Sequence, residues 1–283
     1  MRLFVLSCLF LLAVSCREDA ITNSGVETPA APETELDRWI DTTFRIPYNI
    51  RVEYRWNSDA MDPGHTTVPP REELVQPFLQ AVLNVWLNPY IQVAETGADF
   101  MKDYTCRQLN LVGSGSYNQG SVTLGLAKNG YTITLYTVNW FDLAANTVKK
   151  ETLREYFRTM HHEFGHILNQ RKPYDPNFQR ITGNYSADWT ALNDKQAREL
   201  GFISAYARSA DVEDFVEILS YYITYSDEEW QQLIGSIQSV RGQEYIRLKT
   251  QSVVSYMKNT YGVDLLRLRG EITTAIEIMV NDK

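Results

Sequence analysis

Short runs in which apolar and polar side chains alternate are prominent in the first half of the chain, and this pattern is typical of half-buried β-strands. The first run is IRVEYRW at 50–56, and two others follow at 107–113 and 121–138. In the last run Asn129 and Gly130 separate two alternating stretches. Both residue types tolerate positive φ angles, so this pair predicts a β-hairpin.

The second half of the chain shows apolar residues at helical spacing instead. Ser226, with Glu229 three residues later, predicts a capping box. Gly201 and Gly262 stand where the C-terminus of a helix favours a left-handed residue. The helices predicted in this half lie at 150–170, 192–200, 212–223, 227–239, 242–260 and 264–280.

One further helix is predicted in the first half, at 77–87. Pro77 suits the first turn of a helix, and Asn88 with Pro89 is expected to end it. Strands first and helices afterwards indicate an α+β domain, with an N-terminal mixed sheet that includes the hairpin and a mostly helical C-terminal half. No internal repeat or Gly/Ser linker interrupts residues 36–283, so we expect a single domain there.

The composition of the chain fits this expectation and narrows the choice of partners. The 283 residues are 44% hydrophobic, enough to bury a full core without disulfides. The formal net charge is −8 and no basic patch stands out, which argues against nucleic acid as a partner. The 17 tyrosines and 6 tryptophans could line a groove for a glycan or peptide, but aromatic residues more often fill cores.

The N-terminus has the pattern of an export signal. Arg2 precedes an apolar run at 3–14 that is short for a membrane span, and the run ends at AVSC. This ending resembles a lipobox, which implies removal of residues 1–15 and a lipid on the new N-terminal Cys16. Residues 16–35 are rich in Glu, Thr, Pro and Ala and predict a flexible tether. The alternative is an ordinary secretory signal with a chance cysteine.

Three of the four histidines of the chain lie within TMHHEFGH at 159–166. His162 and His166 are four residues apart on a predicted helix, so their imidazoles share one face and have the spacing at which two histidines can ligate one Zn²⁺. Glu163 points about 100° away around the helix axis and can act as a base beside the metal. His161 points off the ligand face and is expected to serve packing or hydrogen bonding. The alternative is a buried helix without a metal.

A catalytic zinc site needs a third protein ligand and one open position. The metzincin pattern would require glycine at 169 and histidine at 172, but the chain has Asn169 and Lys172. Two candidates remain open from the residues alone. One is Asp188, and the other is the pair Glu213 and Glu217, of which one could ligate while the other anchors a ligand histidine. This pair could also belong to a solvent-facing acidic stripe.

The segment YARSADVEDFVE, taken with HHEFGH, resembles the gluzincin arrangement of metallopeptidases of the anthrax lethal-factor type. In that arrangement a tyrosine stands seven residues before the third zinc ligand, and a second glutamate follows four residues after it. The resemblance implies that Glu213 is the third ligand and that Glu217 anchors a ligand histidine. It also implies that the phenol of Tyr206 hydrogen-bonds the oxyanion that develops during hydrolysis.

A longer part of the chain, from about Leu36 to its end, resembles the substrate import-associated zinc metallohydrolase lipoproteins of Bacteroidetes. The lipobox, HHEFGHILNQ and EDFVE carry this resemblance. It implies a zincin-like fold, one bound zinc ion and a peptide or protein substrate. It also implies an outer-membrane lipoprotein, held by the lipid on Cys16 and exposed on the cell surface, with a TonB-dependent importer as a candidate partner.

These features together predict a zinc metallopeptidase in which Glu163 takes a proton from the attacking water and passes it to the leaving amine. The hairpin strand GYTITLYTV at 130–138 is a candidate wall of the cleft, because an edge strand in zincin folds commonly pairs with extended substrate. Alternatively, this strand only completes the sheet. The competing hypothesis for the whole protein is a surface accessory module that binds a glycan or peptide for the importer without cutting it.

Overall fold

The structure is a computed structural model that describes residues 33–55, 67–118, 121–123, 125–128, 130–141 and 149–281. The contacts within the chain separate Met1–Thr34 from a compact unit, Glu35–Lys283. The predicted signal segment, Cys16, most of the predicted tether and Asn129 of the hairpin lie outside the described residues. No helix in the described ranges is long and apolar enough to cross a membrane.

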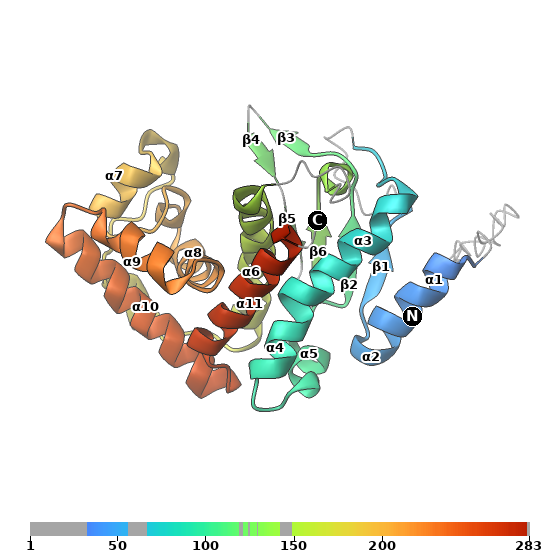
Figure 1. Cartoon of the computed structure of the whole chain (residues 1–283). Coiled ribbons are helices and arrows are strands. Elements are labelled where there is room, and N and C mark those ends of the chain that lie inside the picture. Colours follow the sequence, from blue (N-terminus) through green and yellow to red (C-terminus); the bar gives the residue numbers. More distant parts are fainter. Residues whose placement is uncertain are drawn as a thin grey trace, which may run out of the picture. The chain divides into compact units, whose positions relative to one another are not determined.

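A four-stranded mixed sheet is the main β-structure of the compact unit (Figure 1). In spatial order its strands are β1 (Arg51–Glu53), β2 (Gln108–Leu111), β6 (Thr132–Leu135) and β5 (Gly125–Lys128). β1, β2 and β6 are parallel, whereas β5 is antiparallel to β6. β5 and β6 form the predicted hairpin, in which Gly130 has a φ of 69°. A separate antiparallel pair consists of β3 (Ser116–Asn118) and β4 (Ser121–Thr123).

Helices make up most of the rest of the described chain. The first half contains α1 (Glu35–Ile40), α2 (Ile46–Tyr48), α3 (Glu72–Val82), α4 (Asn88–Val93) and α5 (Ala98–Tyr104). The second half contains α6 (Lys150–Arg171), α7 (Asp194–Glu199), α8 (Asp211–Thr224), α9 (Asp227–Gly235), α10 (Val240–Tyr261) and α11 (Leu265–Asn281). The sheet in the first half and the helices in the second confirm the predicted α+β class.

The expectation that the strand at 130–138 is an edge strand is wrong. The strand within this segment, β6, lies between β2 and β5, so β5 is the edge strand of the described sheet. Burial explains the inner place of β6, because Ile133 and Leu135 are fully buried and Thr134 on the other face is 2% exposed. A strand covered on both faces has no water to satisfy its backbone, so it needs a hydrogen-bonded neighbour on each side.

The helix predicted at 77–87 belongs to a longer helical segment, and both of its predicted ends are wrong. α3 begins five residues before Pro77, and a π-helical turn at Leu83–Leu87 leads directly into α4. In that turn the N–H of Asn88 donates to a carbonyl five residues back. The wider turn relieves the clash that the ring of Pro89 would make in a regular α-helix, so this proline does not end the segment.

The predicted helices of the second half lie close to the observed ones because local signals determine their ends. Ser226 and Glu229 form the capping box of α9, with both reciprocal hydrogen bonds present. The helix predicted at 227–239 is the exception, since α9 ends at Gly235. It stops there because Ser239 is the N-cap of α10, so the chain between the two must leave the helical path.

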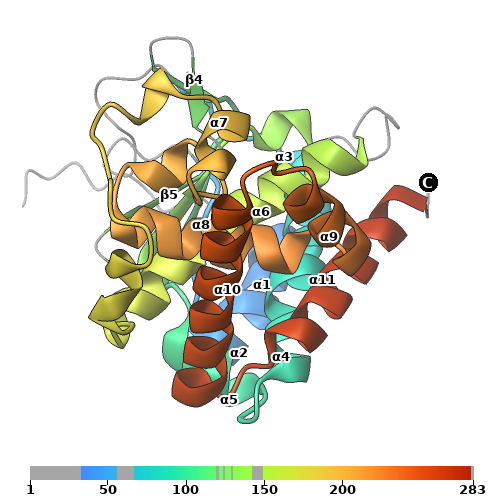
Figure 2. The same cartoon turned by 90° about the vertical axis from the view of Figure 1, so that its left-hand side faces the viewer.

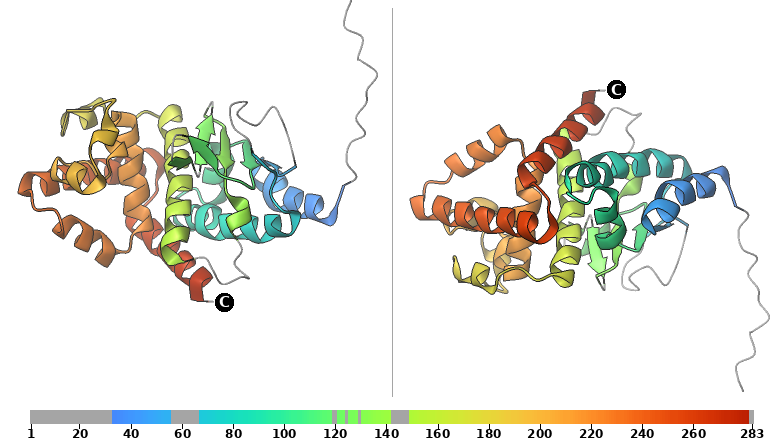
Figure 3. Two further views of the ribbon diagram at one scale, coloured as in Figure 1. Left: turned by 90° about the horizontal axis from the view of Figure 1, so that it is seen from above. Right: turned by 90° about the horizontal axis from the view of Figure 1, so that it is seen from below.

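α6 lies between the sheet with the first-half helices on one side and α8, α9 and α10 on the other (Figure 3). One side of α6 packs against β5 and β6, and the other side packs against α8. α8 in turn lies between α6 and α10 (Figures 1 and 2). The apolar residues that predicted this helix are all fully buried: Leu153, Phe157, Met160, Phe164, Ile167 and Leu168.

α8 packs tightly against α6 at Gly165. A Cβ atom at this position would lie 2.9 Å from Cγ1 of Val216 and 3.2 Å from Cδ2 of Leu219. Any other residue would therefore push the two helices apart. Because His162 and His166 flank this glycine on α6, the close approach brings the first turns of α8 to the histidines.

Candidate metal centre

His162 and His166 lie one turn apart on α6, and their Nε2 atoms are 3.2 Å apart. The helix forms here because the apolar stripe described above buries its opposite face. The side chain of His162 is 8% exposed and that of His166 is 18% exposed, so His162 is buried and His166 is partly open to solvent. The pair presents two imidazole nitrogens to one point in space, as the sequence predicts.

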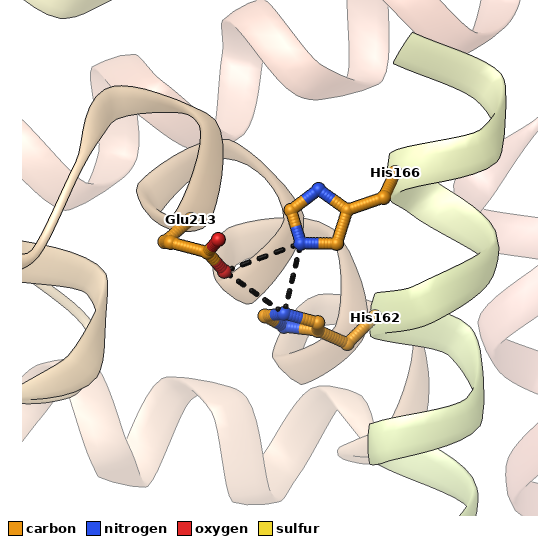
Figure 4. Close-up of side chains that lie close together, drawn as sticks. All are labelled: His162, His166 and Glu213. Atoms are coloured by element: carbon orange, nitrogen blue, oxygen red, sulfur yellow. Dashed lines mark hydrogen bonds and ion pairs between the residues drawn. The ribbon is translucent and has the colours of Figure 1, made fainter. Parts of the chain in front are cut away.

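Glu213 comes from the first turn of α8 and completes a triangle with the two histidines (Figure 4). Its Oε2 atom lies 3.1 Å from Nε2 of His162 and 3.2 Å from Nε2 of His166. Among the described residues, His162, His166 and Glu213 form the one group of three potential ligands whose donor atoms lie within 4.8 Å of one another.

The size of this triangle fits a zinc ion. Ligands about 2.0–2.1 Å from a tetrahedral zinc lie about 3.3–3.4 Å from one another, and the three observed separations are 3.1, 3.2 and 3.2 Å. Two imidazoles and a carboxylate are also a donor set that zinc uses in catalytic sites, with the fourth position left open. The residues present therefore fit a zinc ion, with His162, His166 and Glu213 as its ligands.

Glu217, one turn further along α8, holds the other side of the His162 ring. Its Oε1 atom is 2.9 Å from Nδ1 of His162 and 3.6 Å from Nη1 of Arg158. A proton on Nδ1 donates to this carboxylate and leaves the lone pair of Nε2 directed at Glu213. Glu217 thus fixes the imidazole in the tautomer that a metal needs.

The carboxylates make the site favourable for positive charge. Burial alone lowers the pKa of His162, but hydrogen bonds to Glu213 and Glu217 outweigh it and raise that pKa to about 10. Burial likewise opposes ionisation of Glu213, yet the two histidines hold its pKa below the usual range. The same field that holds a proton on the histidine would hold a divalent cation between the three side chains.

Tyr206 lies beside the triangle on a short 3₁₀ turn, Tyr206–Arg208, and its side chain is 39% exposed. Its ring centroid is 5.9 Å from that of His162 and 5.1 Å from that of Trp189, which packs edge-on against it. Burial, with the nearby Glu213 carboxylate, raises the pKa of the Tyr206 phenol. The phenol is therefore a neutral hydrogen-bond donor at the edge of the site.

Glu163 is 9% exposed and lies under the edge strand β5. A Cβ atom at Gly125 of β5 would be 3.5 Å from Cγ of Glu163 and 2.9 Å from Cγ2 of Thr159. The missing side chain at position 125 is what lets the strand approach α6 this closely. β5 and the Glu163 side chain are thus neighbours, and β5 is the last strand of the sheet in the described residues, although the sequence pointed to the other strand of the hairpin.

Asp188 and His161 lie apart from the triangle. Asp188 is exposed on the segment before Trp189 and is not part of the group of potential ligands found among the described residues. His161 is fully buried, with its ring centroid 5.9 Å from that of Tyr90, and burial lowers the pKa of its imidazole to about 3. A neutral, buried imidazole is a packing residue, as the sequence suggested.

Several residues that support the site were not predicted from the sequence. Arg158 could have been found, because it precedes His162 by four residues on the same helical face. The buried ion pair between Asp214 and Lys249, with Oδ2 and Nζ 2.6 Å apart, ties the start of α8 to α10. No local pattern predicts this pair or Ser204, because their partners are distant in the sequence.

Ser204 joins Glu217 to the turn that carries Tyr206. Its Oγ atom donates to Oε2 of Glu217 at 2.5 Å and accepts from the N–H of Ala207 at 3.1 Å. Hydrogen bonds therefore connect His162 through Glu217 and Ser204 to the turn that carries Tyr206, without a gap. One hydroxyl couples the orientation of a candidate ligand to the position of the phenol.

Ser204→Ala is expected to weaken zinc binding by about 10- to 100-fold, because the carboxylate that orients His162 loses a donor. The measurement is the zinc dissociation constant by competition with a chromophoric chelator. Ser220→Ala is the matched control, since Ser220 is also a buried serine but its Oγ donates to the backbone carbonyl of Glu217 and not to the Glu217 carboxylate. Equal zinc affinity in both variants would show that Ser204 does not support the site.

A mixed α+β fold whose central helix carries His162 and His166, with Glu213 opposite them, defines a candidate zinc site of the kind found in metallopeptidases. Comparison with known families agrees. Residues 29–266 match the family described as "Putative zinc-binding metallo-peptidase", and the chain belongs to this family.

A solved structure is similar over most of the chain. It is the crystal structure of "a putative zinc-binding metallo-peptidase" from Bacteroides caccae ATCC 43185, which is 33% identical in sequence. The similarity covers 88% of this chain and 95% of that chain, with a TM-score of 0.74. No curated protein matches the chain. The fold and the family together support a metallopeptidase.

Proposed function

We propose that the protein is a zinc-dependent metallopeptidase of the gluzincin type, with one zinc ion held by His162, His166 and Glu213. The observation that carries the proposal is the triangle of donor atoms with sides of 3.1, 3.2 and 3.2 Å, contributed by two helices. Its size and donor set suit a zinc ion with an open fourth position. Membership of the family of zinc-binding metallopeptidases supports the same activity.

In this proposal each group beside the metal has one task. Zinc, when bound, supplies a Lewis acid that lowers the pKa of a water and polarises the scissile carbonyl. Glu163 follows a ligand directly in the sequence, so its carboxylate would stand beside a bound metal. There it would accept the proton of the attacking water and pass it to the leaving amine. The phenol of Tyr206 donates a hydrogen bond to the developing oxyanion.

β5 provides the surface along which an extended substrate would bind. Within the described part of the chain it is an edge strand, so one row of its backbone N–H and C=O groups has no partner strand there. A peptide that pairs with this edge lies over α6 at Glu163, because Gly125 lets β5 approach the helix there. We propose that this pairing carries the scissile bond to the site.

The place of the protein in the cell is also a proposal. The lipobox and the acidic tether that follows it support an outer-membrane lipoprotein anchored through Cys16 and exposed on the cell surface. A peptide or protein would be the substrate there, and a TonB-dependent import complex a candidate partner. Metabolic labelling with an alkyne fatty acid, compared between wild type and Cys16→Ser, tests the anchor.

The activity is tested by digestion of a peptide library followed by mass spectrometry. We expect cleavage by the zinc-loaded protein, none after removal of the metal with 1,10-phenanthroline, and recovery when one equivalent of zinc is returned. Cleavage that survives metal removal would contradict a zinc mechanism. A zinc-loaded protein that binds peptides or glycans without cutting them would instead support the accessory-module alternative.

A further inference from the structure

A cavity of about 570 Å³ opens directly beside the proposed zinc ligands. Its wall is formed by the last turns of α6, the segment 173–179 and the first turn of α8. His166 and Glu213 belong to this wall, so the cavity and the metal site share two residues. A volume of this size is in the range of ligand-binding pockets and holds one long side chain with the backbone that carries it.

The part of the wall away from the proposed zinc ligands carries a negative charge. Besides the proposed ligands His166 and Glu213, the cavity is lined by one charged side chain, that of Asp211. No Lys or Arg is found among the described residues that line it. Asn169, Gln170 and Gln179 contribute neutral amides. Both polar atoms of the Asn169 amide are buried without a hydrogen-bond partner among the described residues.

The Asp211 carboxylate is held in a fixed position. The phenol of Tyr174 donates to its Oδ2 atom at 2.8 Å. The Tyr174 ring is in turn stacked on Phe215, with centroids 4.2 Å apart and planes within 7°. A charged group oriented by a rigid aromatic pair is preorganised, which reduces the conformational entropy that the site loses when a ligand binds.

We propose that this cavity is the specificity pocket of the enzyme and that it takes a lysine or arginine side chain adjacent to the scissile bond, with Asp211 as its counter-charge. The inference rests on the proposed peptidase function. The aliphatic stem of such a side chain packs against Pro173, Pro176 and Val212, and its cationic end reaches the carboxylate. A substrate aspartate or glutamate is disfavoured, because it would bring a second carboxylate next to Asp211.

The test compares peptides that are identical except for lysine, methionine or glutamate at each position flanking the cleaved bond. For the wild-type protein we expect kcat/KM at one of these positions to be about 10- to 100-fold higher with lysine than with methionine, and lowest with glutamate. Asp211→Asn, which keeps the shape of the side chain, is expected to remove most of the lysine preference. Tyr174→Phe keeps the charge but frees the carboxylate and should reduce the preference by less.

Asp99→Asn is the matched control, because Asp99 is an exposed aspartate on α5 that does not line the cavity. It should keep the full lysine preference. A wild-type enzyme that cleaves without preference for lysine, or an Asp211→Asn variant that keeps that preference, overturns the inference and leaves the peptidase function standing.

A binding measurement separates the inference from catalysis. Fluorescence anisotropy with the same peptides, carried out on Glu163→Gln and on Glu163→Gln combined with Asp211→Asn, reports affinity without turnover. We expect the dissociation constant of the lysine peptide to rise by about 10-fold or more in the double variant, and that of the methionine peptide to change little. If the wild-type protein does not cleave these peptides but lysine peptides bind in a way that depends on Asp211, the proposed function is refuted and the pocket is kept. If all peptides bind equally well, the pocket is refuted.

Discussion

Glu163→Gln is expected to lower kcat for peptide cleavage by about 10²- to 10⁴-fold while leaving the zinc content unchanged. The substitution keeps the shape of a side chain that is 9% exposed under β5, but removes the basic oxygen that would accept the proton of the attacking water. Glu163 is not one of the three residues of the donor triangle, so metal affinity should not follow activity. Steady-state kinetics and plasma mass spectrometry of the same preparation measure both quantities.

The control for this substitution is Glu155→Gln. Glu155 lies on the same helix but is exposed, so the change in net charge is the same and activity should remain near that of the wild type. Wild-type cleavage by Glu163→Gln would remove the glutamate from the mechanism. No cleavage by any variant, with peptide binding and zinc retained, would favour the accessory-module alternative.

Glu213→Ala is expected to weaken zinc binding by more than about 100-fold and to abolish peptide cleavage. The substitution removes one corner of a three-ligand triangle, which costs more than the loss of a group that only orients a ligand. Asp188→Ala should retain stoichiometric zinc, because Asp188 is exposed and lies outside the triangle. Zinc content after gel filtration in metal-free buffer distinguishes the two variants.

Folding must be checked alongside the metal, since α8 also carries the buried ion pair between Asp214 and Lys249. Circular dichroism of Glu213→Ala should match that of the metal-free wild-type protein. Loss of zinc in Asp188→Ala but not in Glu213→Ala would transfer the third ligand to Asp188 and refute the gluzincin assignment.

The elements that could be predicted are those whose causes are local in the sequence. The helix predicted at 150–170 is observed at Lys150–Arg171. A proline-free stretch with apolar residues at helical spacing predicts an amphipathic helix without information from the rest of the chain. The C-terminal end of α10 followed from Gly262, which has a φ of 64° and accepts a left-handed conformation without strain. The position of His162 and His166 on one face of the helix could be predicted because they are four residues apart.

The errors arose where the surroundings overrule a local preference. Pro77 and Pro89 predict the two ends of a helix, but a π-helical turn and the packing of buried residues around it carry the helical segment past the second proline. The strand at 130–138 was expected at the edge of the sheet. Alternation of apolar and polar residues predicts that a strand exists, but strand order depends on partners that are far apart in the chain.

The sequence by itself determined the class of fold, the helix with two histidines on one face and the glutamate beside them, because each depends on spacings of a few residues. It left Asp188 and the pair Glu213 and Glu217 open as sources of the third ligand until a family resemblance favoured the pair. The tertiary structure placed Glu213 within 3.2 Å of both histidines by packing α8 onto α6 at Gly165. It also decided which strand lies at the edge of the sheet, which residues Ser204 contacts and where a cavity opens beside Asp211. Each of these depends on contacts between distant segments, which only the packing of the complete core can fix.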